Sequence, residues 1–174
     1  MNPSRILCIV SLTLCGMCAG LASSTYHYQG AVFTEASVPY QLGERITGAL
    51  VLTAALPANM APADIPRANV LGFDFNDGQQ NRNFTNSTVC RLILGTDASG
   101  NINAWNIWMR QEIPSASDVR FSMETYSLPD FSGDLVGSAV FPSACGAGAL
   151  QPRAASLIPG LWSLEGLYAN GFEQ

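Results

Sequence analysis

Glycine and proline interrupt this chain so often that its sequence predicts no helix of ordinary length. The 174 residues include 16 glycines and 10 prolines. Few windows place apolar residues at i, i+3, i+4 and i+7, whereas the short runs between the breaks alternate apolar and polar residues. Alternation with a period of two is typical of strands that bury one face. We therefore expect an all-β fold, an antiparallel and jelly-roll-like β-sandwich of about eight strands.

The stretch 89–126 has the clearest strand pattern. If Thr96 pairs with Asn101 across an Asp-Ala-Ser-Gly turn, and Arg110 pairs with Asp118 across a loop, the apolar residues of three strands share one face. A glycine bulge in the turn is an alternative that shifts the first pairing by one residue. The predicted core face comprises Leu92, Leu94, Trp105, Ile107, Met109, Val119, Phe121 and Met123.

Five further segments are predicted to be strands, namely 26–33, 45–52, 70–75, 134–141 and 161–167. Alternation within the second and third of these segments predicts two more sets of side chains that share a face. The sets are Ile46, Gly48, Leu50 and Leu52, and then Leu71, Phe73 and Phe75. The proline-rich stretch between these two segments is predicted to be a loop.

The first residues have the layout of a secretory signal peptide. Residues 1–5 carry one positive charge, and residues 6–18 are an almost unbroken apolar run followed by small residues. The run is shorter than the roughly 20 apolar residues that span a bilayer. We expect a signal peptide over 1–24, with cleavage after Ala22 or Ser24.

Removal of the signal peptide leaves one domain-sized segment. We expect a single β-sandwich domain over 25–167, a flexible tail over 168–174, and no transmembrane segment in the mature chain. Lipidation at Cys15 or Cys18 is the competing fate, but a large residue precedes each of these cysteines. The predicted location is extracytoplasmic, either secreted or periplasmic.

The mature chain is acidic and contains no lysine. After Arg5 is lost, 7 arginines face 13 Asp and Glu residues, which gives a net charge of −6. Such a surface repels phosphate backbones, so nucleic acid and anionic membranes are not expected as partners. We expect a glycan or an envelope protein as partner, without further identification.

Two cysteines remain after the signal peptide, Cys90 and Cys145. An even number of cysteines in an exported chain favours a disulfide, here closing a loop of about 56 residues. Loop-closure entropy gives such a bridge about 4 kcal/mol of stabilisation. Two buried, unpaired thiols are the alternative.

The sequence offers little support for catalysis. A Ser or Cys triad needs an imidazole base, and the only histidine is His27, on a predicted strand near the cleavage site. Among the carboxylates, Glu124 alone lies in mid-strand on a face that a cleft would use, so a glycan hydrolase with two carboxylates is a minor alternative. We predict neither an enzyme nor a bound cofactor.

One oxygen-rich stretch resembles a calcium loop. Asp74, Asn76 and Asp77 precede Gly78, but the glycine is in the fifth position, whereas an EF-hand needs it in the sixth. A hairpin turn explains the same residues without a metal, because Asn, Asp and Gly tolerate a positive φ. We therefore predict no metal site here.

Trp108 is the residue that we single out for binding. It lies three positions after Trp105, so a strand sends the two rings to opposite faces. With Trp105 in the core, Trp108 lies on a polar face with Glu124, Tyr126 and Arg120, the last as a cation–π neighbour. Such a face suits the stacking of a sugar; the alternative is that a loop or a second sheet covers Trp108.

The resemblance of this chain to known proteins rests on six runs. They are Tyr28-Gln-Gly-Ala-Val-Phe33, Pro39-Tyr40, Gly43-Glu-Arg-Ile-Thr-Gly48, Leu56-Pro-Ala-Asn59, Phe73-Asp-Phe-Asn-Asp-Gly78 and Thr96-Asp-Ala-Ser-Gly-Asn-Ile102-Asn-Ala-Trp105. These runs are similar to those of an uncharacterised group of exported bacterial β-sandwich proteins, many of which carry a PEP-CTERM sorting tail. No such tail follows here. The resemblance implies an exported β domain, and it implies no activity and no site residues.

Together these features favour a non-enzymatic binding or structural protein that is secreted or associated with the cell envelope. A carbohydrate-binding module is the second function that the sequence supports, because Trp108 and its polar neighbours suit a sugar. A weakly supported glycan hydrolase is the third.

Overall fold

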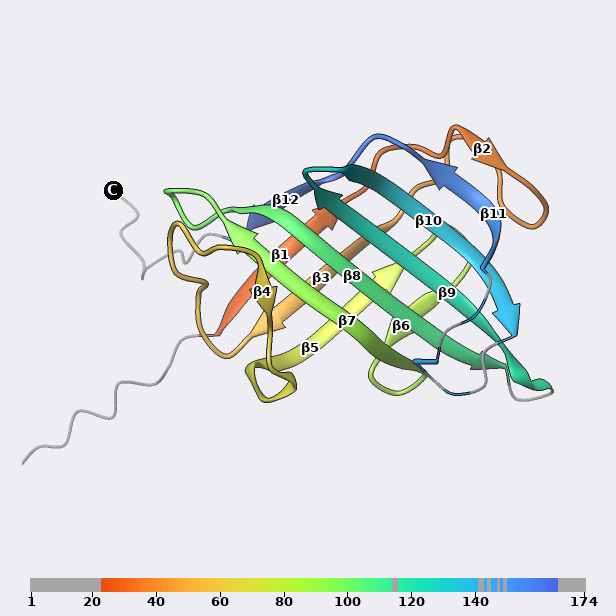
Figure 1. Cartoon of the computed structure of the whole chain (residues 1–174), viewed down its shortest axis with the longest axis horizontal. Helices are drawn as coiled ribbons and strands as arrows, with labels where there is room; N and C mark the ends of the chain where they lie inside the picture. The colour runs from red at the N-terminus through yellow and green to blue at the C-terminus, as the bar shows by residue number, and fades with distance from the viewer. Residues whose placement is uncertain are drawn as a thin grey trace, which may run out of the picture.

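The computed structural model describes residues 23–113, 116–140, 143, 145, 146, 148 and 150–165. The predicted signal peptide and C-terminal tail lie almost wholly outside these residues. The described chain forms two antiparallel sheets, one of five strands and one of seven, whose strands cross in Figure 1. The antiparallel β-sandwich predicted from the sequence is thereby confirmed.

The order of strands within each sheet follows the chain closely. The five-stranded sheet has the order β12 (Leu161–Leu164), β1 (Ser24–Gln29), β3 (Thr47–Leu52), β5 (Val70–Asn76) and β6 (Asn81–Asn83). The seven-stranded sheet has the order β2 (Glu35–Ala36), β11 (Gln151–Ser156), β10 (Phe131–Val140), β9 (Ala116–Leu128), β8 (Ile102–Ile113), β7 (Ser87–Thr96) and β4 (Ala63–Asp64). From β7 to β11 every strand pairs with the next one along the chain, so this sheet is built on a meander.

Twelve strands are described, where the sequence predicts about eight. Three of the additional strands, β2, β4 and β6, have only two or three residues and lie at sheet edges. The sequence does not predict these strands because alternation is not detectable over so few residues. Short edge strands also leave little unpaired backbone with which another chain could pair. The predicted proline-rich loop contains β4 and a 3₁₀ turn at Arg67–Asn69. The described part of the chain contains no helix that is long and apolar enough to cross a membrane.

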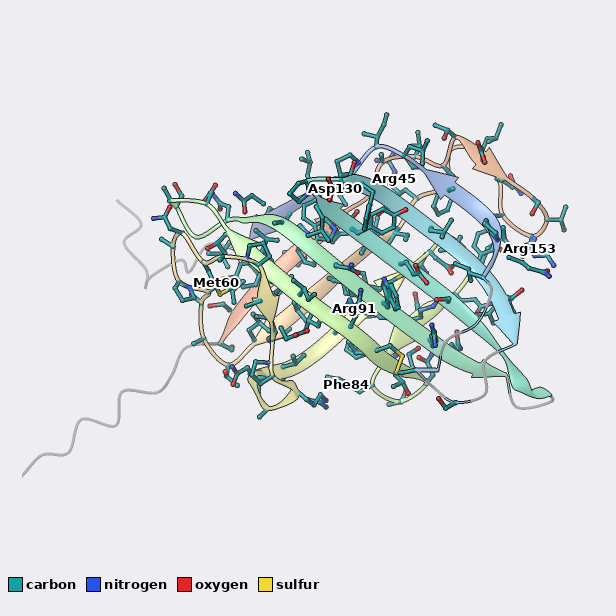
Figure 2. The ribbon with its side chains drawn as sticks, in the orientation of Figure 1. Arg45, Met60, Phe84, Arg91, Asp130 and Arg153 are labelled. Carbon is teal, nitrogen blue, oxygen red and sulfur yellow. A yellow bond between two sulfur atoms is a disulfide. The ribbon has the colours of Figure 1, made fainter. Side chains whose placement is uncertain are left out.

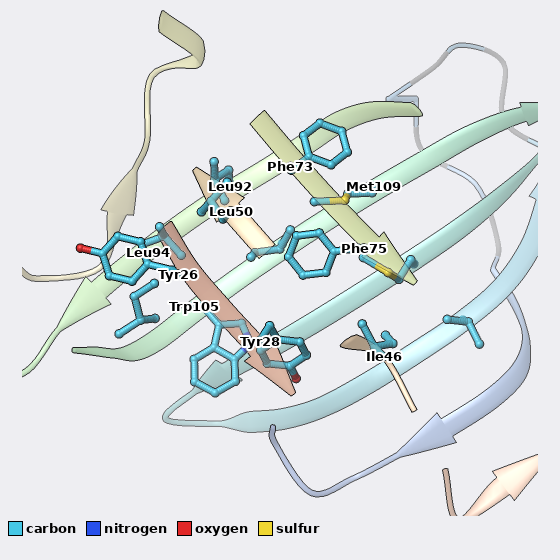
Figure 3. Packing of buried hydrophobic residues seen from close by; sticks show 14 of the residues in the cluster. Tyr26, Tyr28, Ile46, Leu50, Phe73, Phe75, Leu92, Leu94, Trp105 and Met109 are labelled. Atoms are coloured by element: carbon cyan, nitrogen blue, oxygen red, sulfur yellow. The ribbon is translucent and has the colours of Figure 1, made fainter. Parts of the chain in front are cut away.

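The core lies between the two sheets, as Figure 3 shows. Six of the eight residues of the predicted core face are buried, and Phe121 is partly exposed. The Val119 side chain lies outside the described part. The opposite sheet contributes buried aromatic rings, among them Tyr26, Tyr28, Phe73 and Phe75. The predicted faces of the long strands are therefore confirmed.

The predicted registers of these strands are wrong, although their faces are right. Leu94, not Leu92, lies opposite Trp105, and Met109 lies opposite Met123 rather than Val119. The first pairing moves because Asn101 is part of the turn: its N–H donates to Asp97 Oδ1 at 2.9 Å. The pairing of β8 with β9 moves because β8 continues to Ile113 and β9 begins at Ala116, whereas the sequence predicts a longer loop between them. Next to the turn, Thr96 pairs with Ile102 beside a bulge between Gly95 and Thr96, a shift of one residue, as the bulge alternative predicts. Over most of the strands the pairings change by two and four residues, and even shifts keep each side chain on its face.

Leu71 is another correction. It is 56% exposed, although alternation groups it with Phe73 and Phe75, which are buried. Val51 pairs with Gly72, and the next residue of β3 pairs with Val70, so Leu71 is the extra residue of a β-bulge. The bulge turns Val70 into the core instead of Leu71.

Candidate functional site

The two tryptophans of β8 lie on opposite faces of the seven-stranded sheet, as predicted. Trp105 is 4% exposed within the core, and its indole N–H donates to Thr125 Oγ1 at 2.9 Å. Trp108 is partly buried on the outer face. The alternation of the strand thus places one aromatic ring of β8 where a ligand can reach it.

Neighbouring strands place charged residues beside Trp108. Arg91 of β7 and Glu124 of β9 lie directly opposite it, and Arg110 lies two residues further along β8, opposite Ser122. The guanidinium carbon of Arg91 is 4.2 Å from the centroid of the Trp108 ring, a cation–π contact. Figure 2 shows Arg91 over the middle of this sheet.

The cation beside Trp108 is Arg91, where the sequence predicts Arg120. The Arg120 side chain lies outside the described part. Arg120 lies four residues before Glu124 in β9, and its backbone pairs with that of Glu112 in β8. Arg91 and Arg120 belong to the same predicted polar face, and the observed register places Arg91 directly opposite Trp108.

A hollow of about 410 Å³ opens on this face. Three of the residues that line it come from the sheet, namely Trp108, Arg110 and Glu124. The opposite wall is the segment after β10, and its described lining residues are Cys145, Gly146, Gly148 and Leu150. Trp108 is partly exposed beside this wall, so the face is neither fully open nor closed.

Two bonds hold that wall against the sheet. Cys90 and Cys145 form the predicted disulfide, with their Cα atoms 5.2 Å apart. One guanidinium nitrogen of Arg110, Nη1, donates to the Gly146 carbonyl at 2.6 Å. The disulfide and Arg110 therefore shape the hollow as well as stabilise the fold.

The electrostatics of the hollow depend on Glu124. Burial raises the pKa of this carboxyl above its ordinary value, while Ser122, Arg110 and Arg91 oppose the rise. The Ser122 hydroxyl donates to Glu124 Oε1 at 3.1 Å. Arg110 is only 4% exposed, so a largely buried cation and a partly buried carboxyl share the lining.

Tyr126, the fourth predicted binding residue, does not line the hollow. Tyr126 pairs with Asn106, and this pair lies two residues along the strands from the pair of Trp108 and Glu124. Its ring meets the edge of Phe131 at a centroid distance of 5.5 Å, and burial raises the pKa of its hydroxyl. The structure thus brings together Trp108 and Glu124, adds Arg91 and Arg110, and leaves Tyr126 beside the site.

The predicted calcium candidates lie at the end of β5 and in the turn that follows it. Asp77 is fully buried, and its carboxylate pairs with Arg82 Nη1 at 2.5 Å and accepts the Tyr40 hydroxyl at 2.9 Å. Asn76 Oδ1 accepts the Gly78 N–H at 2.7 Å, whereas Asp74 is exposed on the outer side of β5. Across the described chain, no group of three His, Cys, Asp or Glu residues suits a metal ion.

His27 lies on an exposed position of β1. Its Nε2 atom is 3.5 Å from Glu165 Oε2, and the two side chains are 50% and 63% exposed. This is the environment of an ordinary surface histidine on a strand.

Asp134 is a buried carboxyl in the core. It is 1% exposed, and its Oδ1 atom accepts the Tyr28 hydroxyl at 2.5 Å. The Tyr28 hydroxyl in turn accepts a hydrogen bond from Thr125 Oγ1 at 2.7 Å. Burial raises the pKa of Asp134 from 3.8 to about 6. A shifted pKa often indicates catalysis, but a substrate cannot reach a carboxyl that is closed off between two sheets.

The raised pKa of Asp134 predicts a pH-dependent stability. The folded state holds this proton more tightly than the unfolded state, so stability falls as the pH rises from 3.8 to about 6 and is level above that. The loss corresponds to about 3 kcal/mol. Asp134→Asn cannot titrate, so urea unfolding between pH 4 and pH 8 is expected to show the wild type losing about this much relative to the variant. A constant difference between the two proteins would contradict the shift.

Neither a protein-family model, nor a curated protein, nor a solved structure matches the chain. Any role of the hollow is therefore argued from its own residues.

Proposed function

We propose that this protein is an exported, non-enzymatic binding protein whose ligand is a glycan, held in the hollow beside Trp108. The observation that carries the proposal is the partly exposed Trp108 ring on a polar face, next to Glu124 and Arg110. Binding sites commonly combine one aromatic surface with a few convergent polar groups. A pyranose fits this combination, because its C–H face packs on an aromatic ring and its hydroxyls bond to carboxylates and guanidinium groups.

The composition of the hollow favours binding over hydrolysis. Most glycosidases use two carboxyl groups, about 5–10 Å apart. Glu124 is the only carboxylate among the described residues that line the hollow, and it accepts a hydrogen bond from Ser122. A single carboxylate of this kind serves to orient a sugar hydroxyl.

The disulfide supports a site of action outside the cytoplasm. Disulfides persist in oxidising compartments and are rare in the cytosol. The Cys90–Cys145 bridge ties the wall of the hollow to β7. An exported protein keeps this bridge, and with it the shape of the hollow.

A glycan-array screen of the mature, oxidised protein tests the proposal. We expect binding to at least one glycan class, and we expect Trp108→Ala to weaken it about tenfold or more, as loss of an aromatic anchor does. The matched control is Leu42→Ala, which truncates a side chain that is 69% exposed between β2 and β3, outside the lining of the hollow, and is expected to leave binding intact.

Two results would contradict the proposal. One is a well-folded wild-type protein, by circular dichroism, that binds no glycan on the array. The other is a bound glycan whose affinity is the same for Trp108→Ala and the wild type. In either case, pull-downs from the native envelope become the next search for a partner.

A further inference from the structure

We infer that the protein has a second binding site, an apolar pocket beside Arg67 that takes a small branched aliphatic carboxylate. This site goes beyond the proposed function, because it shares no described lining residue with the hollow beside Trp108. The inference depends on the lining of the pocket, on its volume and on the surroundings of Arg67.

The pocket runs from the surface into the core. Its described lining comprises five apolar side chains and one arginine, namely Ile65, Val70, Phe84, Val89, Leu92 and Arg67. Val70 belongs to β5 of one sheet and Leu92 to β7 of the other, and their side chains are only 5% and 8% exposed. The Arg67 side chain, by contrast, is exposed. The pocket therefore has an apolar floor between the sheets and a charged mouth.

The volume of the pocket limits what the floor can hold. It is about 90 Å³. An apolar protein cavity of about 150 Å³ binds one benzene molecule, so this pocket has room for about four carbon atoms. A buried water makes about three hydrogen bonds, and Arg67 is the only polar side chain among the described lining residues. The floor therefore suits a small hydrocarbon group, such as an isobutyl group, better than it suits water.

The Arg67 guanidinium is held at the mouth without a counter-charge. Its central carbon, Cζ, lies 3.8 Å from the centroid of the Phe84 ring, and Nη1 donates to the Val70 carbonyl at 2.8 Å. The Phe84 ring packs in turn against Phe73, with their centroids 4.4 Å apart. Among the described residues, no carboxylate forms an ion pair with Arg67. A ring face and a carbonyl position the guanidinium but leave its positive charge uncompensated.

The charge at the mouth selects an acid. A guanidinium binds a carboxylate through charge-assisted hydrogen bonds, and an isolated cation on a chain of net charge −5 attracts a small anion. A carboxylate attached directly to the isobutyl group lies at Arg67 when that group fills the floor. The described lining has no amide or hydroxyl side chain that would bind the backbone of a peptide. The ligand that fits is thus a free acid of the size of 3-methylbutanoate.

A matched pair of small molecules tests the charge of the ligand. The probes are 3-methylbutanoate and 3-methylbutanamide, which have the same shape, titrated into the full mature protein at pH 7 and followed by ¹H–¹⁵N NMR. We expect the acid to bind about tenfold or more tightly than the amide, as a charge-assisted hydrogen bond provides. The backbone N–H signals of Val70 and Val89 are expected to shift until the site is saturated.

Substitutions of Arg67 separate its charge from its packing. We expect Arg67→Gln to remove the preference for the acid and Arg67→Lys to retain part of it, because lysine keeps the charge without the planar fork. The matched control is Arg153→Gln, since Arg153 is an exposed arginine of β11 that lies away from Phe84 in Figure 2. This control is expected to bind both probes as the wild type does.

Two further variants and two further probes test the size of the pocket. Ile65→Phe and Val89→Leu add carbon atoms to the lining, and we expect Ile65→Phe to weaken binding of the acid about tenfold or more, because it displaces two or more buried methylene groups. Val89→Leu is expected to have a smaller effect in the same direction. Circular dichroism confirms that both variants fold. Octanoate and the peptide Gly-Gly-Leu are expected to bind more weakly than 3-methylbutanoate.

Four results would overturn the inference. They are the absence of saturable binding of 3-methylbutanoate, equal affinity for the acid and the amide, a preference that Arg67→Gln leaves intact, and an affinity for the acid that neither filling variant changes. Tighter binding of octanoate or of the peptide would replace the small acid by a fatty acid or by a peptide terminus, and would likewise overturn it. None of these results bears on glycan binding beside Trp108.

Discussion

Replacing Asp77 by alanine is expected to destabilise the protein by about 3–5 kcal/mol, the cost of leaving a buried charge without its partner. Asp77 and Arg82 are both fully buried, and their charged groups are 2.5 Å apart. Asp77 also accepts the Tyr40 hydroxyl and the backbone N–H groups of Gln79 and Gln80. Its loss removes the counter-charge of Arg82 and the bonds that hold the turn.

Urea unfolding monitored by circular dichroism measures this effect, and the chain contains a close control. Asp74→Ala changes an exposed carboxylate of the neighbouring strand and is expected to alter stability by less than about 0.5 kcal/mol. The double variant Asp77→Ala/Arg82→Met removes both charges, so it is expected to recover part of the loss. If Asp77→Ala were no more damaging than Asp74→Ala, the buried ion pair would not have the role described.

Removing the disulfide is expected to have an effect of similar size. The cysteines are 55 residues apart in sequence, and loop-closure entropy predicts that Cys90→Ala/Cys145→Ala loses about 4 kcal/mol. Glycan binding is expected to weaken as well, because Cys145 is part of the wall of the hollow.

Treatment of the wild type with a dithiol reductant is the matched experiment for the disulfide. The reduced protein and the double variant are expected to agree in stability, because both lack only the bridge. A loss below about 1 kcal/mol, together with unchanged glycan affinity, would show that the wall stays in place without the disulfide.

The sequence predicts which face a residue occupies better than it predicts the partner of that residue. Alternation alone places Trp105 inward and Trp108 outward, and this survives pairing errors of two and four residues because both are even. The pairing of β7 with β8 depends on the hydrogen bond that holds Asn101 in the turn with Asp97. The pairing of β8 with β9 depends on how far β8 continues, which is to Ile113. Those details decide that Arg91 lies directly opposite Trp108.

Other parts of the site have no local signal in the sequence. The wall around Cys145 and Gly146 is joined to the sheet by the disulfide and by the bond from Arg110 to Gly146, which is 36 residues away in the chain. Asp77 is predictable as a turn residue, but its burial depends on Arg82 and on Tyr40, which is 37 residues away. The β-bulge that exposes Leu71 depends on the mismatch between two paired strands, which neither strand shows by itself.

The most direct test of the account is whether the ligand touches Trp108. The chain has three tryptophans, so its indole N–H region in a ¹H–¹⁵N NMR spectrum contains three signals, and Trp108→Phe identifies one of them. During titration with a glycan that binds, we predict that the Trp108 signal shifts while that of Trp105, bonded to Thr125 in the core, stays in place. A titration that leaves the Trp108 signal unmoved, or that moves only Trp162 beside His27 in the other sheet, would contradict the account.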